Sequence, residues 1–186
     1  MIKLNNIPNV LTISRLLCCP LWLILFYFDL YICCLILIFY SGITDFLDGF
    51  LARKYNATSL IGKALDPIAD KIFTSTALIT FIVDSRANFI VVSVIIIREL
   101  MVSGLRETLS NYNKSNLLEV TFLAKIKTTS QFLAIFILAL VPLNISFSNT
   151  INNFGTIFLY VTAILTLYTG YKYVVISIKE LKKIER

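Results

Sequence analysis

Four aspartates at fixed spacing are the residues of this chain best suited to chemistry. Asp45 and Asp48 are three residues apart and Asp66 and Asp70 are four apart, so each pair shares one face of a helix. Four carboxylates on two facing helices would repel one another unless cations neutralise them. Their oxygens are hard ligands that suit Mg²⁺ or Mn²⁺. The spacing therefore predicts a divalent-metal site within largely apolar sequence, where an uncompensated carboxylate is unfavourable.

Small and basic residues accompany the first pair. Gly49 and Ala52 have little side-chain bulk, so a ligand can approach the backbone closely. Arg53 adds a fixed positive charge of the kind that binds a diphosphate. A spacer of eight residues then separates Arg53 from the second group. Written out, the pattern is Asp45-x2-Asp48-Gly49-x2-Ala52-Arg53, the spacer, and Gly62-x3-Asp66-x3-Asp70.

This pattern resembles the signature of the CDP-alcohol phosphotransferases, integral membrane enzymes that make phospholipids. Every position of that signature is matched. Residues 6–15 and 125–131 are similar to the bacterial phosphatidylglycerophosphate synthase branch of the family. The resemblance implies transfer of the phosphatidyl group of CDP-diacylglycerol to sn-glycerol 3-phosphate, which gives phosphatidylglycerophosphate and CMP. It also implies a homodimer.

The same resemblance divides the roles of the aspartates, which spacing alone cannot do. It implies two divalent cations, Mg²⁺ or Mn²⁺. Asp45 and Asp66 are expected to bridge both ions, and Asp48 to hold the first. Asp70 is expected to touch the second ion and to act as the catalytic base for the attacking hydroxyl. Asp66, which precedes Pro67, also suits a helix N-cap, and this structural alternative is left open.

CDP-diacylglycerol is expected to contact residues that follow the family pattern. These are Asn9, Thr12, Gly49, Arg53 and Ser59. Asn9 and Thr12 have an alternative role as helix-starting residues. Gly62 is expected to form a turn that aims the following helix.

Basic residues later in the chain are candidates for binding the acceptor phosphate. Arg98 and Arg106 are eight residues apart, and Lys125 and Lys127 follow. A buried Arg98 needs an anionic partner, and the adjacent Glu99 is expected to point elsewhere on the helix. A cluster of cations suits glycerol 3-phosphate better than neutral inositol or zwitterionic serine. Snorkelling to the membrane interface is the alternative for each lysine.

Composition places these residues in a membrane. The 186 residues are 58% hydrophobic with a mean hydropathy of +0.82, and their apolar runs reach spanning length. We expect an all-α integral membrane protein, a bundle of about six transmembrane helices. The expected spans are residues 10–28, 32–51, 67–83, 89–109, 128–143 and 154–176. No linker, repeat or low-complexity segment divides residues 1–186, which predicts a single domain without a cleavable signal peptide.

The charge distribution predicts the orientation. The net charge is +6, but nearly all lysines and arginines fall in breaks on one side of the expected spans, with only Arg86 on the other. By the positive-inside rule, both termini and the aspartates face the cytoplasm, and nucleic acid is not an expected partner. The resemblance implies that the membrane is a bacterial inner membrane. The chain has no histidine, which excludes a Ser-His triad or a histidine base. Its cysteines form adjacent pairs without metal-ligand spacing, so packing is the better interpretation.

Three alternatives stay open. The first is a sister activity of the family with another acceptor, namely cardiolipin, phosphatidylserine or phosphatidylinositol phosphate synthesis. The second is a cation or proton transporter that uses the aspartates as an ion path, although transport does not require Gly49, Ala52 and Arg53 at this spacing. The third is a structural membrane scaffold, which leaves the aspartates unexplained.

Overall fold

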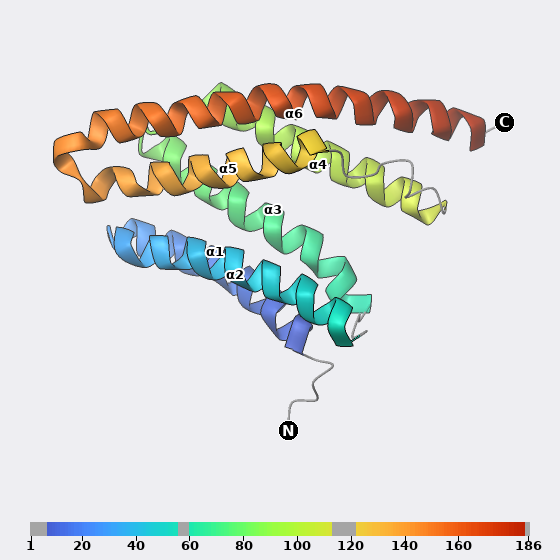
Figure 1. The fold of residues 1–186 in the computed structure, drawn as a ribbon, viewed down its shortest axis with the longest axis horizontal. Helices are drawn as coiled ribbons and strands as arrows, with labels where there is room; N and C mark the ends of the chain where they lie inside the picture. Colours follow the sequence, from blue (N-terminus) through green and yellow to red (C-terminus); the bar gives the residue numbers. More distant parts are fainter. Residues whose placement is uncertain (1–6, 56–59, 113–121, 185–186) are drawn as a thin grey trace.

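The computed structural model describes the backbone of residues 7–55, 60–112 and 122–184, with side chains over residues 10–47, 65, 68–112, 122–144 and 146–183. These ranges form α-helices and contain no strand. The helices are α1 Ile7–Tyr27, α2 Tyr31–Tyr55, α3 Leu60–Val83, α4 Phe89–Asn111, α5 Phe122–Leu140 and α6 Ser148–Ile184 (Figure 1). Two 3-10 helices, Val141–Leu143 and Ile145–Phe147, join α5 to α6. The predicted all-α class is confirmed.

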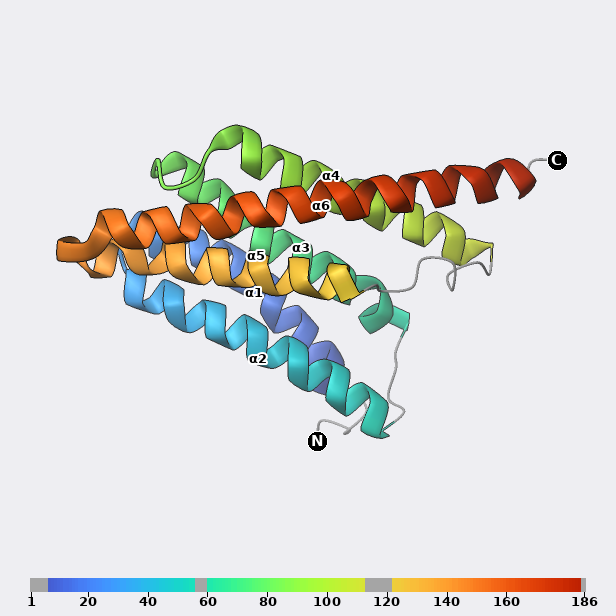
Figure 2. The ribbon, with the colours of Figure 1, turned by 45° about the horizontal axis from the view of Figure 1, so that its top comes forward.

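The helices run alternately in opposite directions. The connections at residues 28–30, 84–88 and 141–147 gather at one end of the molecule, which we call the turn end (Figures 1 and 2). The starts of α1, α3 and α5 and the far ends of α2, α4 and α6 lie toward the opposite end, where α6 projects beyond its neighbours. Arg86, the one cation expected on its side, lies at the turn end.

A mixed aromatic and aliphatic core holds the helices together. α5 packs along α6, α1 contacts both α2 and α3, and α4 lies on α6. Trp22 of α1 is fully buried, and its ring meets Phe73 and Phe81 of α3 edge-on at 5.7 and 6.2 Å. Its indole N–H donates to Thr80 Oγ1 at 3.1 Å, which satisfies the buried donor. These contacts of Trp22 hold α1 against α3 in the core.

The outer surface is apolar, as expected for a membrane protein. Large side chains such as Leu17, Ile90 and Ile164 are 65–69% exposed, and a soluble monomer rarely presents so continuous an apolar surface. Among the residues that the structure describes, three helical segments are long and apolar enough to cross a bilayer, namely Val10–Tyr27, Phe122–Leu143 and Ser148–Lys183, and α2 carries a shorter apolar run, Tyr31–Leu47. Each expected span falls on one helix with differences at its ends. The number of spans and their orientation remain predictions.

The start of α3 corrects two expectations. The helix begins at Leu60, so Gly62 and Asp66 both lie inside it. Gly62 is therefore not a turn, and Asp66 is not the N-cap. The reason is that apolar residues 60, 61, 64 and 65 recur at helical spacing and extend the apolar face back from Pro67. Asn9 and Thr12 lie within α1, which begins at Ile7, so neither is the cap of that helix.

Candidate functional site

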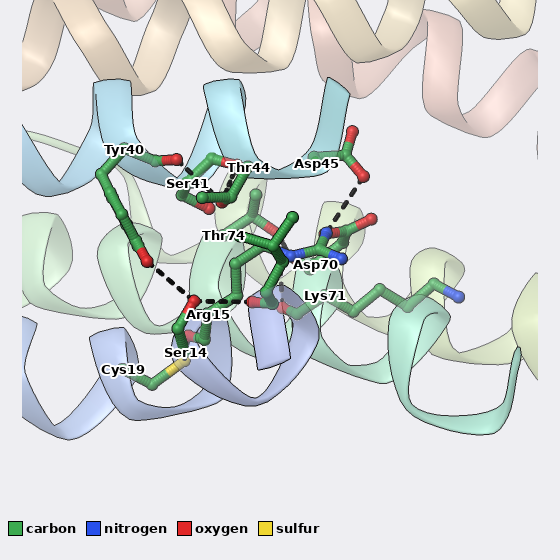
Figure 3. Close-up of polar contacts among 11 residues, drawn as sticks. Ser14, Arg15, Cys19, Tyr40, Ser41, Thr44, Asp45, Asp70, Lys71 and Thr74 are labelled. Carbon is green, nitrogen blue, oxygen red and sulfur yellow. Dashed lines mark hydrogen bonds and ion pairs between the residues drawn. The ribbon is translucent and has the colours of Figure 1, made fainter. Parts of the chain in front are cut away.

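An arginine connects the two acidic helices. Arg15 of α1 is only 1% exposed, and its Nη1 lies 3.0 Å from Oδ1 of Asp45 on α2 (Figure 3). The same Nη1 also ion-pairs with Oδ1 of Asp70 on α3. Carboxylates from two helices therefore face one position. Asp45 and Asp70, one from each half of the motif, thus meet at Arg15, and the roles assigned to them stay predictions.

Short polar contacts hold this arrangement in place. The Tyr40 hydroxyl on α2 donates to Ser14 Oγ on α1 at 2.8 Å, next to Arg15 (Figure 3). Thr74 Oγ1 donates to the Asp70 carbonyl at 2.9 Å, one turn further along α3. Hydroxyls that bond to their own helix in this way remain satisfied without leaving the apolar interior. The Tyr40 and Thr74 hydroxyls are therefore satisfied close to the two carboxylates.

The acidic pair has the chemistry that divalent cations require. The Asp45 and Asp70 side chains are 60% and 45% exposed, so their oxygens stay accessible while one oxygen of each faces the cation Arg15. An oxygen set of this kind fits Mg²⁺ or Mn²⁺. Asp48 and Asp66 lie on the same helices, α2 and α3, but their side chains are outside the described residues. Among the side chains that the structure describes, no group of three or more potential ligands forms a metal cluster, so the set of four stays a prediction.

The expected nucleotide contacts are placed only in part. Asn9 lies in α1, and Gly49 and Arg53 lie in α2, but nothing beyond their helical backbone is described. Ser59 falls outside the described residues. Thr12 is 1% exposed and lies one turn before Arg15 on α1. Its hydroxyl faces the bundle interior rather than solvent, so its contact with a nucleotide remains a prediction.

A basic cavity of about 620 Å³ lies between α3, α4, α5 and α6. The structure brings together Arg98, Arg106 and Lys127, three of the four predicted phosphate ligands, on its wall. Lys125 is exposed and is not among the lining residues. Two residues along a helix correspond to a rotation of about 200°, so Lys125 and Lys127 face opposite sides of α5. Three of the four predicted cations therefore line the cavity, and Lys125 lies on the surface.

Arg98 is held by α6. Its Nη2 donates to Thr169 Oγ1 at 2.7 Å, and its guanidinium carbon lies 5.6 Å from the centre of the Tyr173 ring. Between them, a Cβ at Gly170 would lie only 2.8 Å from Arg98 Cγ. The missing side chain at this position is what lets Arg98 lie against the backbone of α6. Nothing in the local sequence of α4 indicates this contact.

Glu99 is the unexpected member of the cavity. Its Oε1 lies 3.5 Å from Arg98 Nη1, and the same oxygen accepts a charge-assisted hydrogen bond from Lys127 on α5. The expectation that Glu99 points elsewhere is wrong. Neighbouring Cα positions differ by about 100° around the helix, but these side chains are long enough to meet over the groove between α4 and α5. Sequence spacing within one helix cannot indicate a partner on another.

The acidic and basic groups border adjoining spaces. A second cavity of about 400 Å³ is lined by Asp45 and Asp70. It shares a wall with the basic cavity, formed by Lys71, Glu99, Arg106, Lys127 and Thr128. Lys71 was not predicted as a site residue. Its one sequence signal is its position directly after Asp70, and its ammonium donates to Ser103 Oγ on α4.

The fold and this site define an apolar helical membrane protein in which an acidic pair and a basic cavity lie side by side. Residues 5–168 match the family described as CDP-alcohol phosphatidyltransferase, and the chain belongs to this family. Similar proteins are named CDP-diacylglycerol--glycerol-3-phosphate 3-phosphatidyltransferase. One from Blochmanniella floridana is 39% identical over 91% of this chain and 89% of its own length. Those from Rickettsia bellii (strain RML369-C) and Wigglesworthia glossinidia brevipalpis are 40% and 38% identical and cover 91% and 95% of this chain and 93% and 97% of their own lengths.

Family membership bears on the open alternatives. Membership of a phosphatidyltransferase family accounts for Gly49, Ala52 and Arg53 together with the aspartates. An ion path does not require the first three residues, and a scaffold does not explain the aspartates. The predicted family is therefore confirmed, and the transporter and scaffold interpretations are disfavoured.

Proposed function

We propose that this protein transfers the phosphatidyl group of CDP-diacylglycerol to sn-glycerol 3-phosphate, with release of CMP. The names of its relatives support this reaction. The structural observation that carries it is the shared wall between the Asp45–Asp70 cavity and the basic cavity. Donor and acceptor can thus bind in adjoining spaces with the reacting groups at the boundary.

On the donor side, the residues of the motif bind the CDP moiety. Asp45, Asp48, Asp66 and Asp70 hold two divalent cations, which would neutralise the diphosphate and stabilise the departing CMP. Asn9, Thr12, Gly49, Arg53 and Ser59 contact CDP-diacylglycerol. Arg15 keeps the Asp45 and Asp70 carboxylates directed at a common position through its paired contacts.

On the acceptor side, Arg98, Arg106 and Lys127 bind the phosphate of glycerol 3-phosphate, with Lys71 beside them. In the lining of the basic cavity, four cations against the carboxylates of Glu99 and Glu107 leave a net charge of +2. A phosphate monoester carries roughly −1.5 to −2 at neutral pH. The volume of about 620 Å³ also lies in the range of small-molecule pockets. The charge favours this acceptor over inositol or serine, and the volume is large enough to hold it.

The chemical step uses Asp70, which lines the acidic cavity and precedes Lys71 of the shared wall. The hydroxyl oxygen of glycerol 3-phosphate forms a bond to the phosphorus that carries the diacylglycerol. The bond from that phosphorus to the CMP oxygen breaks, and CMP leaves with the electron pair. Asp70 accepts the hydroxyl proton, which requires the hydroxyl to extend from the basic cavity into the acidic one. Its place beside Lys71, in the lining of the acidic cavity, is compatible with this role.

The cellular setting follows from the charge asymmetry. We place the active site and both termini on the cytoplasmic side of a bacterial inner membrane, because water-soluble glycerol 3-phosphate and CMP are cytosolic. Arg86 then marks the opposite face. The single domain of residues 1–186, the six spans and the homodimer complete the proposal.

The test uses purified protein in liposomes with CDP-diacylglycerol and Mg²⁺. CMP release is followed with glycerol 3-phosphate, serine, inositol phosphate or phosphatidylglycerol offered separately. We expect release with glycerol 3-phosphate alone, loss of release with a chelator, and recovery with added Mg²⁺ or Mn²⁺. Release with another acceptor instead would move the protein to a sister activity. No release with any acceptor, from protein shown to be folded, would overturn the proposal.

A further inference from the structure

A carboxylate of the protein already pairs with two of the four cations that line the basic cavity. The side chain of Glu99 is 18% exposed, whereas the side chains of its partners Arg98 and Lys127 are 7% and 8% exposed. One oxygen, Oε1, contacts both cations from two helices. A buried cation needs an anion beside it, and here the chain supplies one of its own.

We propose that Glu99 occupies the position of the acceptor phosphate and determines which acceptors the cavity admits. This inference rests on the proposed function, because it concerns the acceptor site of that reaction. A bound acceptor must displace the Glu99 carboxylate from Lys127 and Arg98. The carboxylate acts as an internal competitor for the site.

The contacts of the two cations explain how this selects an acceptor. Arg98 uses Nη2 for Thr169, so Nη1, the nitrogen beside Glu99, is the one directed at an incoming anion. An acceptor that displaces Glu99 without supplying equal negative charge would leave buried cations uncompensated, which is strongly unfavourable. A phosphate dianion replaces the carboxylate with three acceptor oxygens. Neutral or zwitterionic alcohols cannot do so.

The same contacts permit an opposite role, in which Glu99 only orients Lys127. The two roles predict opposite changes in the affinity for an anion when Glu99 is neutralised. If Glu99 competes with phosphate, neutralising it strengthens anion binding. If it orients Lys127, neutralising it weakens anion binding. Glu99→Gln separates the two because it removes the charge but keeps an oxygen that can accept from Lys127.

The experiment measures inorganic phosphate as a competitive inhibitor against glycerol 3-phosphate, together with the KM for glycerol 3-phosphate. For Glu99→Gln we expect both the inhibition constant and the KM to fall by about 3- to 10-fold, the effect of losing one competing charge-assisted bond. Asp84→Asn is the matched control, since it removes the same charge beside another buried arginine, at a half-exposed position outside both cavity linings. We expect its constants to fall by less than about 2-fold, because exposed charges are well screened.

Other outcomes have distinct meanings. Unchanged or higher constants in Glu99→Gln would overturn the inference. If that variant does not fold, Glu99→Asp provides the second test, because its shorter carboxylate reaches the cations less well and should lower both constants to a smaller extent. Wild-type protein that neither uses glycerol 3-phosphate nor is inhibited by phosphate would instead defeat the proposed function, whatever the variants do.

Discussion

Arg86 and Arg98 are almost equally buried, at 7% and 6% exposure, but they lie in different surroundings. Arg86 lies at the turn end, where its contacts are to other protein groups. It donates to the Leu138 carbonyl at 3.2 Å, pairs with Asp84, and lies 5.5 Å and 5.1 Å from the ring centres of Phe26 and Tyr31. Its partners come from α1, α2 and α5, so it joins helices that are distant in sequence.

Arg98 has comparable partners but also borders a cavity. Thr169, Tyr173 and Glu99 hold it from two helices, and about 620 Å³ of space lies beside it. Burial of a charge is therefore not what marks the site. The distinction is that Arg98 lines the basic cavity, whereas Arg86 lines neither of the two cavities described above.

The largest expected difference between the two regions concerns their carboxylates. Asp70 pairs with Arg15 and Asp84 with Arg86, at 45% and 39% side-chain exposure. We expect Asp70→Asn to reduce the kcat for CMP release by about 10²- to 10⁴-fold, the usual contribution of a general base. Asp84→Asn should change kcat by less than about 2-fold, because a half-exposed ion pair far from substrate contributes little. Equal losses in the two variants, measured in folded protein, would contradict the assignment of Asp70.

A second test compares a variant expected to weaken acceptor binding with a variant expected to lower the stability of the fold. Arg98→Gln should raise the KM for glycerol 3-phosphate by about 10- to 100-fold, since a charge-assisted hydrogen bond contributes about 1.5–3 kcal/mol. Arg86→Gln should leave the KM unchanged and lower the Tm in detergent, because its contacts join α1, α2 and α5 at the turn end. Steady-state kinetics and thermal unfolding are measured on both variants. A change in the KM for glycerol 3-phosphate in Arg86→Gln would contradict the prediction that only the region around Arg98 binds the acceptor.

The smallest expected effect comes from two glycines of α6. A Cβ at Gly170 would meet Arg98 Cγ at 2.8 Å, and one at Gly155 would meet Leu138 Cδ2 at 2.7 Å. Gly170→Ala should push Arg98 from its rotamer and raise the KM for glycerol 3-phosphate by about 2- to 10-fold. Gly155→Ala should instead destabilise the fold by about 1–3 kcal/mol through overpacking, with the KM unchanged.

Gly104→Ala provides the neutral reference for this pair, because nothing lies within 4 Å of a Cβ at that position. Its KM should match that of the wild type, and its Tm should be equal or slightly higher, as alanine favours a helix. If Gly170→Ala behaved like Gly104→Ala in both measurements, the position of Arg98 would not depend on the missing side chain at Gly170 of α6.

Local pattern was enough to predict the helices. Apolar runs of spanning length placed a helix at each expected span, because every backbone group in lipid must be satisfied within its own helix. The start of α3 was missed for a related reason. The Asp66–Pro67 pair looks like a helix start locally, but the apolar face already begins at Leu60.

The sequence by itself determined the family, through the spacing of Asp45, Asp48, Asp66 and Asp70, and the all-helical class, through apolar periodicity. Both depend on residues close together in the chain. Only the tertiary structure decided which residues meet across helices: Arg15 between Asp45 and Asp70, and Glu99 between Arg98 and Lys127. Long charged side chains find partners wherever helix packing brings opposite charges together, and no spacing within a single helix encodes that packing.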